Sequence, residues 1–168
     1  MTVPVDRLKV RADQVLAAAV AGMTAAGIPV PDRRYVVPTA LVAHDCEQVV
    51  VALDQLLPNR GDAAESRPTS QRCIALAIGV FTVHVVRCVP VVASQGQQVV
   101  TPTPAAIDAS AVDLLRDPLA VWNGVLAAYR AGTFGHAREL VFEQATPLGP
   151  NGGLAAWVIR FRLGLMDV

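Results

Sequence analysis

Apolar residues recur at spacings of three and four in the first part of the chain, which predicts a helix over residues 5–26. Its apolar positions are Leu8, Ala12, Val15, Leu16, Ala19 and Met23. Gly27 stands where a helix needs a left-handed residue at its carboxyl end. Prolines then surround a short run from Arg34 to Val37, which indicates an edge strand because proline cannot donate to a central ladder. Residues 46–53 are the next predicted strand.

The most apolar stretch, residues 72–89, predicts one long strand with a bulge at Gly79. The bulky side chains change phase at this glycine: Ile74, Leu76 and Ile78 precede it, and Phe81, Val83 and Val85 follow it. A period-two pattern that slips by one residue at a glycine is typical of a β-bulge. At about 3.3 Å per residue such a strand would span roughly 60 Å, so we expect it to bend or to extend past the body of the domain.

Two polar, aperiodic segments flank this strand and predict loops, at residues 58–71 and 90–102. The first, PNRGDAAESRPTSQ, is long for a compact domain, and loops of this kind are either functional or disordered. We expect it to be mobile in the free subunit and to become ordered against a neighbouring protein.

Thr103 followed by Pro104 predicts the start of a second helix, and Gly132 predicts its end. The pair Asp117-Pro118 predicts a kink, or a restart with Asp117 as a new cap. The expected apolar stripe is Ile107, Ala111, Leu115, Leu119, Trp122, Leu126 and Tyr129.

The remaining residues predict a hairpin, with strands at 138–144 and 154–166 and a turn-rich joint, TPLGPNGG. Bulky side chains share one face of the second strand: Trp157, Ile159, Phe161, Leu163 and Leu165. Val158, Arg160 and Arg162 point the other way.

The order of elements predicts an α+β fold, an antiparallel or mixed sheet with both helices packed on one face. The chain has 168 residues, of which 53% are hydrophobic and 17% charged, a composition that folds. One domain over residues 1–168 is expected at this length.

Charge and targeting signals narrow the function classes. Fourteen basic and fourteen acidic residues cancel, so the chain lacks the long-range field that drives nonspecific binding to nucleic acid or acidic membranes. Charged residues occupy positions 6, 7, 9 and 11, where an export signal would be apolar, so we expect no export signal and a protein made in the host cytoplasm. Cys46, Cys73 and Cys88 are an odd set without a C-x-x-C spacing, which predicts reduced thiols.

The candidate chemistry is sparse. His44-Asp45-Cys46 has the residue types of a nucleophile and its base, but alternation along a strand would turn Asp45 away from the other two. His84 and Cys88 share a strand face, and with His44 and Cys46 they would make a zinc shell, but the x-spacings of one and three are not those of recurrent zinc-finger pairs. Phosphate-binding glycine motifs are missing from the sequence. We therefore predict no catalytic site, no metal and no cofactor.

The arginines are the remaining polar groups of interest. Arg72 and Arg87 bracket the long strand, and Arg160 with Arg162 line one face of the last strand. We expect up to four of these guanidinium groups on the sheet face that the helices leave uncovered. The four arginines are the candidate assembly interface, because guanidinium groups favour planar ion pairs across interfaces. The alternative is a solvated sheet face.

Several segments resemble the tail terminator proteins of long-tailed phages, especially those that infect actinobacteria. The segments are DCEQVVVALDQ, RCIALAIGVFTVHVVRCVP, DPLAVWNGVLAAYRAG and LVFEQATPLGPNGGLAAWVIRFRLGL. They cover most of the chain after residue 45, and the order of elements is similar to that of the lambda-type terminator fold.

The resemblance implies a structural protein of the virion tail and neck. A homo-oligomer, a hexameric ring, would cap the tail tube, stop polymerisation of the major tail tube protein and bind the head–tail connector. Genomic DNA would pass through the lumen without sequence recognition, and no membrane would be involved. The alternatives are another neck or tail-completion protein, or a ligand-binding or enzymatic α+β domain with a pocket near His44, Cys46 or His84.

Overall fold

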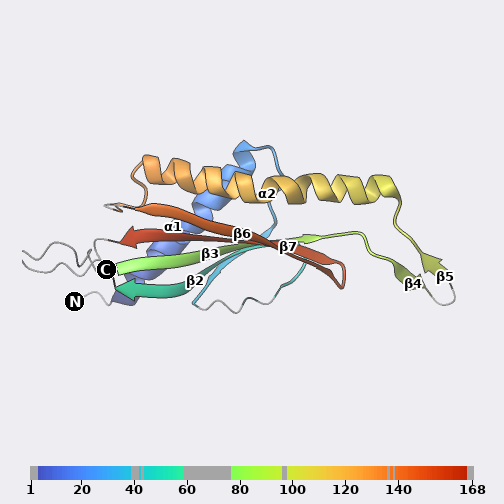
Figure 1. Cartoon of the computed structure of the whole chain (residues 1–168), viewed down its shortest axis with the longest axis horizontal. Coiled ribbons are helices and arrows are strands. Elements are labelled where there is room, and N and C mark those ends of the chain that lie inside the picture. Colours follow the sequence, from blue (N-terminus) through green and yellow to red (C-terminus); the bar gives the residue numbers. More distant parts are fainter. Residues whose placement is uncertain are drawn as a thin grey trace, which may run out of the picture.

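The fold is a mixed sheet of five strands with two helices on one face (Figure 1). It is seen in a computed structural model that describes residues 4–38, 42, 44–58, 77–95, 98–135, 137 and 139–165. The strands lie in the order β1-β2-β3-β7-β6, with β1 parallel to β2 and every other pair antiparallel. Their bounds are β1 Arg33–Val37, β2 Gln48–Pro58, β3 Ala77–Cys88, β6 Leu140–Asn151 and β7 Leu154–Leu165. The predicted α+β class is confirmed.

The first helix and the first strand follow the sequence prediction closely. Helix α1 spans Pro4–Ala25, and Gly27 has a φ of 65°, the left-handed conformation that ends a helix. The edge position predicted for β1 is confirmed. Its parallel pairing with β2 makes the sheet mixed.

Helix α2 spans Pro104–Arg130 and has the predicted ends. The hydroxyl of Thr103 accepts a hydrogen bond from the backbone N–H of Ala106 at 3.2 Å, and Gly132 has a φ of 73°. The helix runs through Pro118 without a break, so the alternative of a restart capped by Asp117 is wrong. Proline removes only one helical N–H, and Asp117 has another partner, described below.

The predicted apolar stripe of α2 is wrong in its first half. Leu115 and Leu119 are 72% and 64% exposed. The buried positions of this helix are Asp117, Ala120, Val121, Gly124 and Val125. The small residues among them follow from the way the two helices cross.

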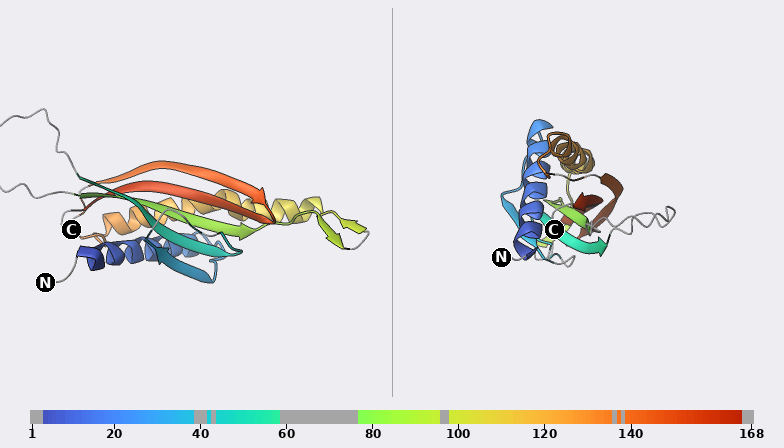
Figure 2. Two further views of the ribbon diagram at one scale, coloured as in Figure 1. Left: turned by 90° about the horizontal axis from the view of Figure 1, so that it is seen from below. Right: turned by 90° about the vertical axis from the view of Figure 1, so that its left-hand side faces the viewer.

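The helices cross with their backbones in contact. A Cβ added to Gly22 would lie 2.1 Å from the carbonyl oxygen of Ala120, and one added to Gly124 would lie 2.2 Å from that of Ala18. Only glycine fits at such distances, so this pair fixes the helices against each other. Both helices pack on the same face of the sheet (Figure 2).

The core lies between the helices and one face of the sheet. Alternate strand positions supply it, and the alternation predicted for β7 is confirmed by the burial of Ile159, Phe161 and Leu163. The other large members are Val15, Met23, Ile28, Val49, Val51, Phe81, Val83, Val85, Val121, Val125, Phe134 and Leu165.

The bulge in this part of the sheet is not at Gly79. Strand β3 pairs with β7 in unbroken register from Ala77 opposite Leu165 to Cys88 opposite Leu154, and the irregularity falls in β2, at Asp54. A Cβ on Gly79 would lie 2.7 Å from the ring of Phe81, so the glycine makes room for that ring. The phase change in the sequence arises because β3 is central and carries apolar residues on both faces.

Two predicted connections are strands. The segment predicted as a loop at residues 90–102 contains a small hairpin, β4 Ala93–Gln95 and β5 Gln98–Val100. The segment TPLGPN belongs to β6, and the turn itself is Gly152-Gly153, with φ values of 57° and 84°. The predicted loop at 58–71, apart from residue 58 at the end of β2, and the first residues of the predicted long strand, including Arg72, lie outside the described residues.

Among the described residues, no helix combines the length and the apolar character that crossing a membrane needs.

Candidate functional site

Arg87, one of the four predicted interface arginines, lies inside the subunit. Its side chain is 6% exposed and reaches from β3 to α2, where Nε donates to Asp117 Oδ2 at 3.0 Å and Nη2 donates to Oδ1 at 2.8 Å. Its Nη1 donates to Glu47 Oε2 at 3.2 Å. The prediction that Arg87 shares a helix-free face with Arg160 and Arg162 is therefore wrong.

Burial and ion pairing have opposite effects on the pKa values of Arg87 and Asp117. Burial acts to lower the pKa of Arg87, but the hydrogen bonds with Asp117 outweigh it and raise that pKa above its usual value. Burial raises the pKa of Asp117, against the lowering effect of Arg87. The pair fixes the middle of α2 to the end of β3.

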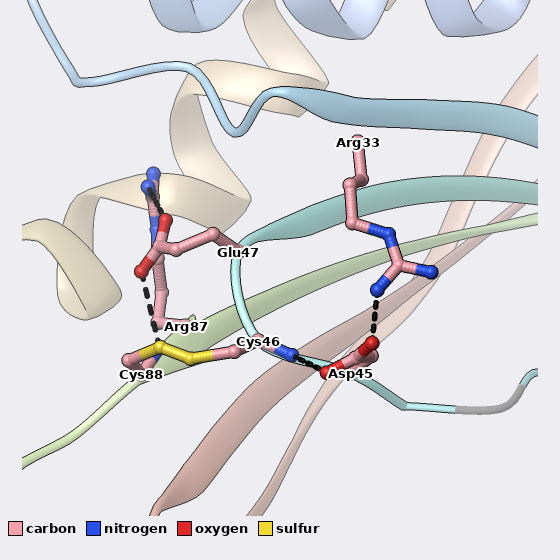
Figure 3. The surroundings of a disulfide bond; sticks show 6 residues. All are labelled: Arg33, Asp45, Cys46, Glu47, Arg87 and Cys88. Atoms are coloured by element: carbon pink, nitrogen blue, oxygen red, sulfur yellow. Dashed lines mark hydrogen bonds and ion pairs between the residues drawn. A yellow bond between two sulfur atoms is a disulfide. The ribbon is translucent and has the colours of Figure 1, made fainter.

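A disulfide between Cys46 and Cys88 lies beside this cluster (Figure 3). The prediction of reduced thiols is wrong for these two cysteines, whose Cα atoms are 5.2 Å apart. They are 42 residues apart in sequence, so only the pairing of β2 with β3 brings them together.

Glu47, next to the disulfide, has a φ of 53°, an unusual value for a residue with a side chain. Its Oε1 accepts the backbone N–H of Cys88 at 3.1 Å, which holds this conformation. Asp45 accepts the backbone N–H of Cys46 at 2.7 Å and pairs with Arg33, and these contacts lower the pKa of Asp45. No local pattern in the sequence predicts any of these contacts.

Arg160 and Arg162 lie on the helix-free face, as their alternation along β7 predicts. Arg160 pairs with Asp54 through Nη1 at 3.1 Å and with Glu143 through Nε at 2.7 Å. Arg162 Nε lies 2.5 Å from the other carboxylate oxygen of Glu143. These contacts are ion pairs in which the Nε–H groups have no well-aligned hydrogen bond.

The two acids of this group were not predicted from the sequence. Asp54 and Glu143 each occupy a register shift, Asp54 in β2 and Glu143 in β6. A bulge turns its extra residue out of the regular alternation, so both carboxylates reach the arginines of β7 from the neighbouring strands. Two positive and two negative groups make this cluster neutral, and all four side chains are partly exposed.

His44 and His84 are brought together, with His44 Nε2 and His84 Nδ1 3.1 Å apart. Burial, and to a smaller extent the nearby His44, lower the pKa of His84 to about 4. A cavity of about 450 Å³ is lined by His44 but not by Cys46 or His84. In the part of the chain that the structure describes, no group of three or more His, Cys, Asp or Glu side chains could hold a metal ion.

Exposed apolar side chains gather in one part of the chain. The first turns of α2 and the β4–β5 hairpin extend past the sheet at one end of the molecule (Figure 1), and we name residues 91–119, which run from just before this hairpin to the middle of α2, the arm. Of the thirteen exposed large apolar residues among those described, eight lie in the arm, so the exposure is local rather than scattered. They are Val91, Val92, Val99, Val100, Ile107, Val112, Leu115 and Leu119.

A second apolar surface is concave. A cavity of about 290 Å³ lies between α1 and β1 and is lined by Leu8, Lys9, Ala12, Val36, Val37, Pro38 and Leu53. We name it the groove. Lys9 is its one charged lining residue, and the side chain of Lys9 is largely exposed.

No protein-family model matches this chain. No curated protein matches it. Among solved structures, the chain is similar to one from a virion of a native gene transfer agent particle, with 15% sequence identity and a TM-score of 0.41. That similarity covers 96% of this chain and 94% of the other.

Proposed function

We propose that this chain is a structural virion protein of the tail terminator type, which forms a ring on the end of the tail tube. The observation that carries the proposal is the arm, which leaves eight large apolar side chains exposed in one region. Large apolar side chains left exposed in one region mark a protein–protein contact. An assembly subunit needs such a surface, whereas a monomer would lose solubility by keeping it.

The segments that resemble tail terminators support the same role. DPLAVWNGVLAAYRAG contains Asp117 and Gly124, and RCIALAIGVFTVHVVRCVP contains Arg87. These are the residues that fix α2 to β3 and to α1. The resembling segments therefore contain the contacts that set the direction of the arm.

In this role the subunit has three kinds of partner. Copies of the same chain make the ring, which needs heterologous contacts between two different surfaces of each subunit. The tail tube protein lies on one side of the ring and the head–tail connector on the other. Arg160 and Arg162 are the candidate residues for docking to one of these, because they lie on the face that the helices leave free.

The experiment is electron microscopy of the purified protein, alone and with polymerising tail tube protein. We expect rings, and tubes that stop growing with a ring at one end. Tubes that grow to the same length with and without the protein would contradict the terminator role, and binding to the connector alone would favour another neck or tail-completion protein.

A ligand-binding or enzymatic role predicts a different result. The purified protein would then stay monomeric, and a small ligand bound in the cavity beside His44 would raise its melting temperature. A screen of small molecules by thermal shift, with His44→Ala as the control, separates this class from the structural one.

A further inference from the structure

We propose that Cys46 and Cys88 form a reversible redox site, which opens and closes by thiol–disulfide exchange and, when closed, holds Glu47 against Arg87. The contacts that carry this proposal lie within one subunit. Only the cellular setting described below rests on the proposed function.

The disulfide can be reached from solvent. Cys46 lies two residues before β2 and is half-buried, whereas Cys88 is the last residue of β3 and is exposed. The two cysteines continue the register in which Gln48 lies opposite Val86, so strand pairing guides their sulfurs together. Exposed disulfides are more easily reduced than protected structural ones, and they are the ones that serve regulation.

The exchange needs the two cysteines and a small-molecule disulfide such as oxidised glutathione. The thiolate of one cysteine attacks a sulfur of this oxidant, forms a mixed disulfide and releases one glutathione thiolate. The other cysteine attacks the protein sulfur of the mixed disulfide, so the bond between Cys46 and Cys88 forms and the second glutathione leaves. Two electrons pass from the protein to the oxidant, and the two cysteine protons end on the two released glutathione molecules. Reduction follows the same path in reverse, with Cys88 as the more accessible point of attack.

Glu47 depends on this bond because its backbone conformation is unfavourable. Its φ of 53° lies in the left-handed region, which a residue with a side chain keeps only where the surrounding contacts enforce it. The contacts here are the disulfide of the neighbouring Cys46 and two hydrogen bonds to the Glu47 carboxylate, from the backbone N–H of Cys88 and from Arg87 (Figure 3). The side chain of Glu47 is 45% exposed, so water competes for both hydrogen bonds. Opening the disulfide therefore favours release of Glu47.

Opening moves one side of the site and leaves the other in place. Strand β3 is paired with β7 up to Cys88, and the next residue, Val89, donates its N–H to the carbonyl oxygen of Gly153 at 2.8 Å. The end of β3 is thus fixed by β7 in both redox states. The segment before β2 is held by side-chain contacts, and its ion pair between Asp45 and Arg33, more than half exposed on both residues, contributes little.

The redox state reaches α2 through Arg87. In the closed state this guanidinium joins three elements, because Arg87 of β3 binds both Asp117 of α2 and Glu47 of the segment before β2. In the open state the pair with Asp117 remains. A virion protein of the proposed kind is made in a reducing cytoplasm and released into oxidising surroundings, so the site would be open during assembly and closed in the released particle.

Thiol trapping in glutathione buffers tests whether the site is reversible. The full chain with Cys73→Ser is equilibrated at a series of ratios of reduced to oxidised glutathione, starting from either form, and free thiols are alkylated and counted by mass spectrometry. We expect both starting forms to reach the same fraction of disulfide, with a folded circular dichroism spectrum throughout. A bond that stays closed at every ratio in the folded protein is a permanent structural disulfide and overturns the proposal, as does a bond that never forms.

The variant Glu47→Ala tests the coupling to Glu47. If closure stabilises the contacts of Glu47, then by thermodynamic reciprocity these contacts favour closure by the same factor. We expect Glu47→Ala to lower the equilibrium constant for disulfide formation by about tenfold, because a charged hydrogen bond is lost in the closed state only. Asp108→Ala, which removes an exposed carboxylate of α2, is the matched control and should leave the constant unchanged. An unchanged constant in Glu47→Ala overturns the coupling.

Hydrogen exchange locates the segment that moves. On reduction we expect faster exchange in peptides that cover residues 45–49 and no change in those that cover residues 154–160 of β7. Equal exchange at residues 45–49 in the two redox forms contradicts the release of Glu47.

The outcomes separate this proposal from the proposed function, because all three measurements use the isolated full chain. A permanent disulfide or an uncoupled Glu47 overturns the redox site even if the protein caps tubes. A reversible and coupled site in a protein that leaves tube growth unchanged supports the redox site and contradicts the terminator role.

Discussion

Arg87 on β3 and Asp117 on α2 form a two-point ion pair, in which the guanidinium donates to both oxygens of a carboxylate with 0% exposure. The pair lies where the arm leaves the body of the domain. It therefore links the core of the subunit to the direction of the arm.

Breaking this pair from one side should be costly. Asp117→Asn leaves the Arg87 charge buried without its main partner, so we expect the free energy of unfolding to fall by about 3–5 kcal/mol. Urea denaturation followed by circular dichroism measures the change. Replacing both residues, Arg87→Met with Asp117→Leu, removes the buried charge and should restore most of the loss, while equal stability of Asp117→Asn and the wild type would show that the pair contributes little.

The stability of the subunit should depend on pH through His84. Because the pKa of this buried side chain is lowered to about 4 in the folded state, the unfolded chain binds its proton first as the pH falls. The contribution of neutral His84 to the free energy of unfolding is complete above pH 6.5 and is lost as the pH falls through about 4. The whole loss is about 3 kcal/mol. Asp117, whose pKa is raised, acts in the opposite direction, so the comparison that isolates His84 is wild type against His84→Gln.

Denaturation of both proteins between pH 7.5 and 4 makes that comparison. This range covers both the ordinary pKa of histidine and the lowered pKa of His84. We expect His84→Gln to flatten the profile whatever its stability at neutral pH. The variant His44→Gln should flatten it partly, since His44 contributes to the lowered pKa. Parallel profiles for His84→Gln and the wild type would contradict the assignment.

Reduction of the disulfide between Cys46 and Cys88 should lower the stability of the subunit. Cys46 and Cys88 close a loop with a sequence separation of 42, for which chain entropy gives about 4 kcal/mol, and measured values are typically about 2–4 kcal/mol. We expect Cys46→Ser with Cys88→Ser, or added reductant, to lower the free energy of unfolding by that amount. Cys73→Ser is the control and should leave the effect of reductant unchanged.

Adding even one methyl group at Gly124, where α1 and α2 cross, should destabilise the subunit. Helix propensity alone would favour Gly124→Ala by about 1 kcal/mol, but the added Cβ meets a carbonyl oxygen of α1 at 2.2 Å. Since backbone must move to relieve this contact, we expect a net loss of about 1–3 kcal/mol in thermal or urea unfolding. The exposed neighbour Asn123 supplies the control, because Asn123→Ala should be neutral or slightly stabilising.

Arg160 and Arg162 should matter more to assembly than to folding. Partly exposed ion pairs contribute about 0–1 kcal/mol each, so Arg160→Ala with Arg162→Ala should change the melting temperature of the isolated subunit only slightly. Docking to the tube or connector should weaken in a tail completion assay, and Arg130→Ala, at the exposed end of α2, should not weaken it. Normal assembly of the double variant would mean that Asp54 and Glu143 already satisfy these arginines.

Local signals predicted the ends of the helices well. Thr103-Pro104, Gly27 and Gly132 act within one helical turn, so their effect can be read from neighbouring residues alone. The same reasoning failed inside α2, where Leu115 and Leu119 continue an apolar periodicity but lie on the exposed face, because the packed face carries Asp117, Ala120, Val121, Gly124 and Val125. Periodicity shows which residues share a helix face and does not show which face the neighbouring elements cover.

The contacts of the candidate site could not be predicted for a related reason. The disulfide and the Arg87–Asp117 pair join residues that are 42 and 30 positions apart, and their partners depend on strand order. Asp54 and Glu143 reach the arginines only because each occupies a bulge. In the sequence, a bulge is visible only as one residue that breaks the alternation of apolar and polar positions. The alternation also breaks at Gly79, but there the glycine makes room for the ring of Phe81.

The position of β7 in the sheet has a consequence for how the protein folds. This strand lies between β3 and β6, yet its partners on β3 precede it by 66 to 88 residues. Until β7 has been synthesised, β3 has one open edge rich in apolar, β-branched residues, which is a template for pairing with other chains. Pairings between such distant segments form slowly because a long loop must close first. The nascent subunit therefore depends on its last strand to protect its central one, and truncation before β7 should yield aggregated rather than partly folded protein.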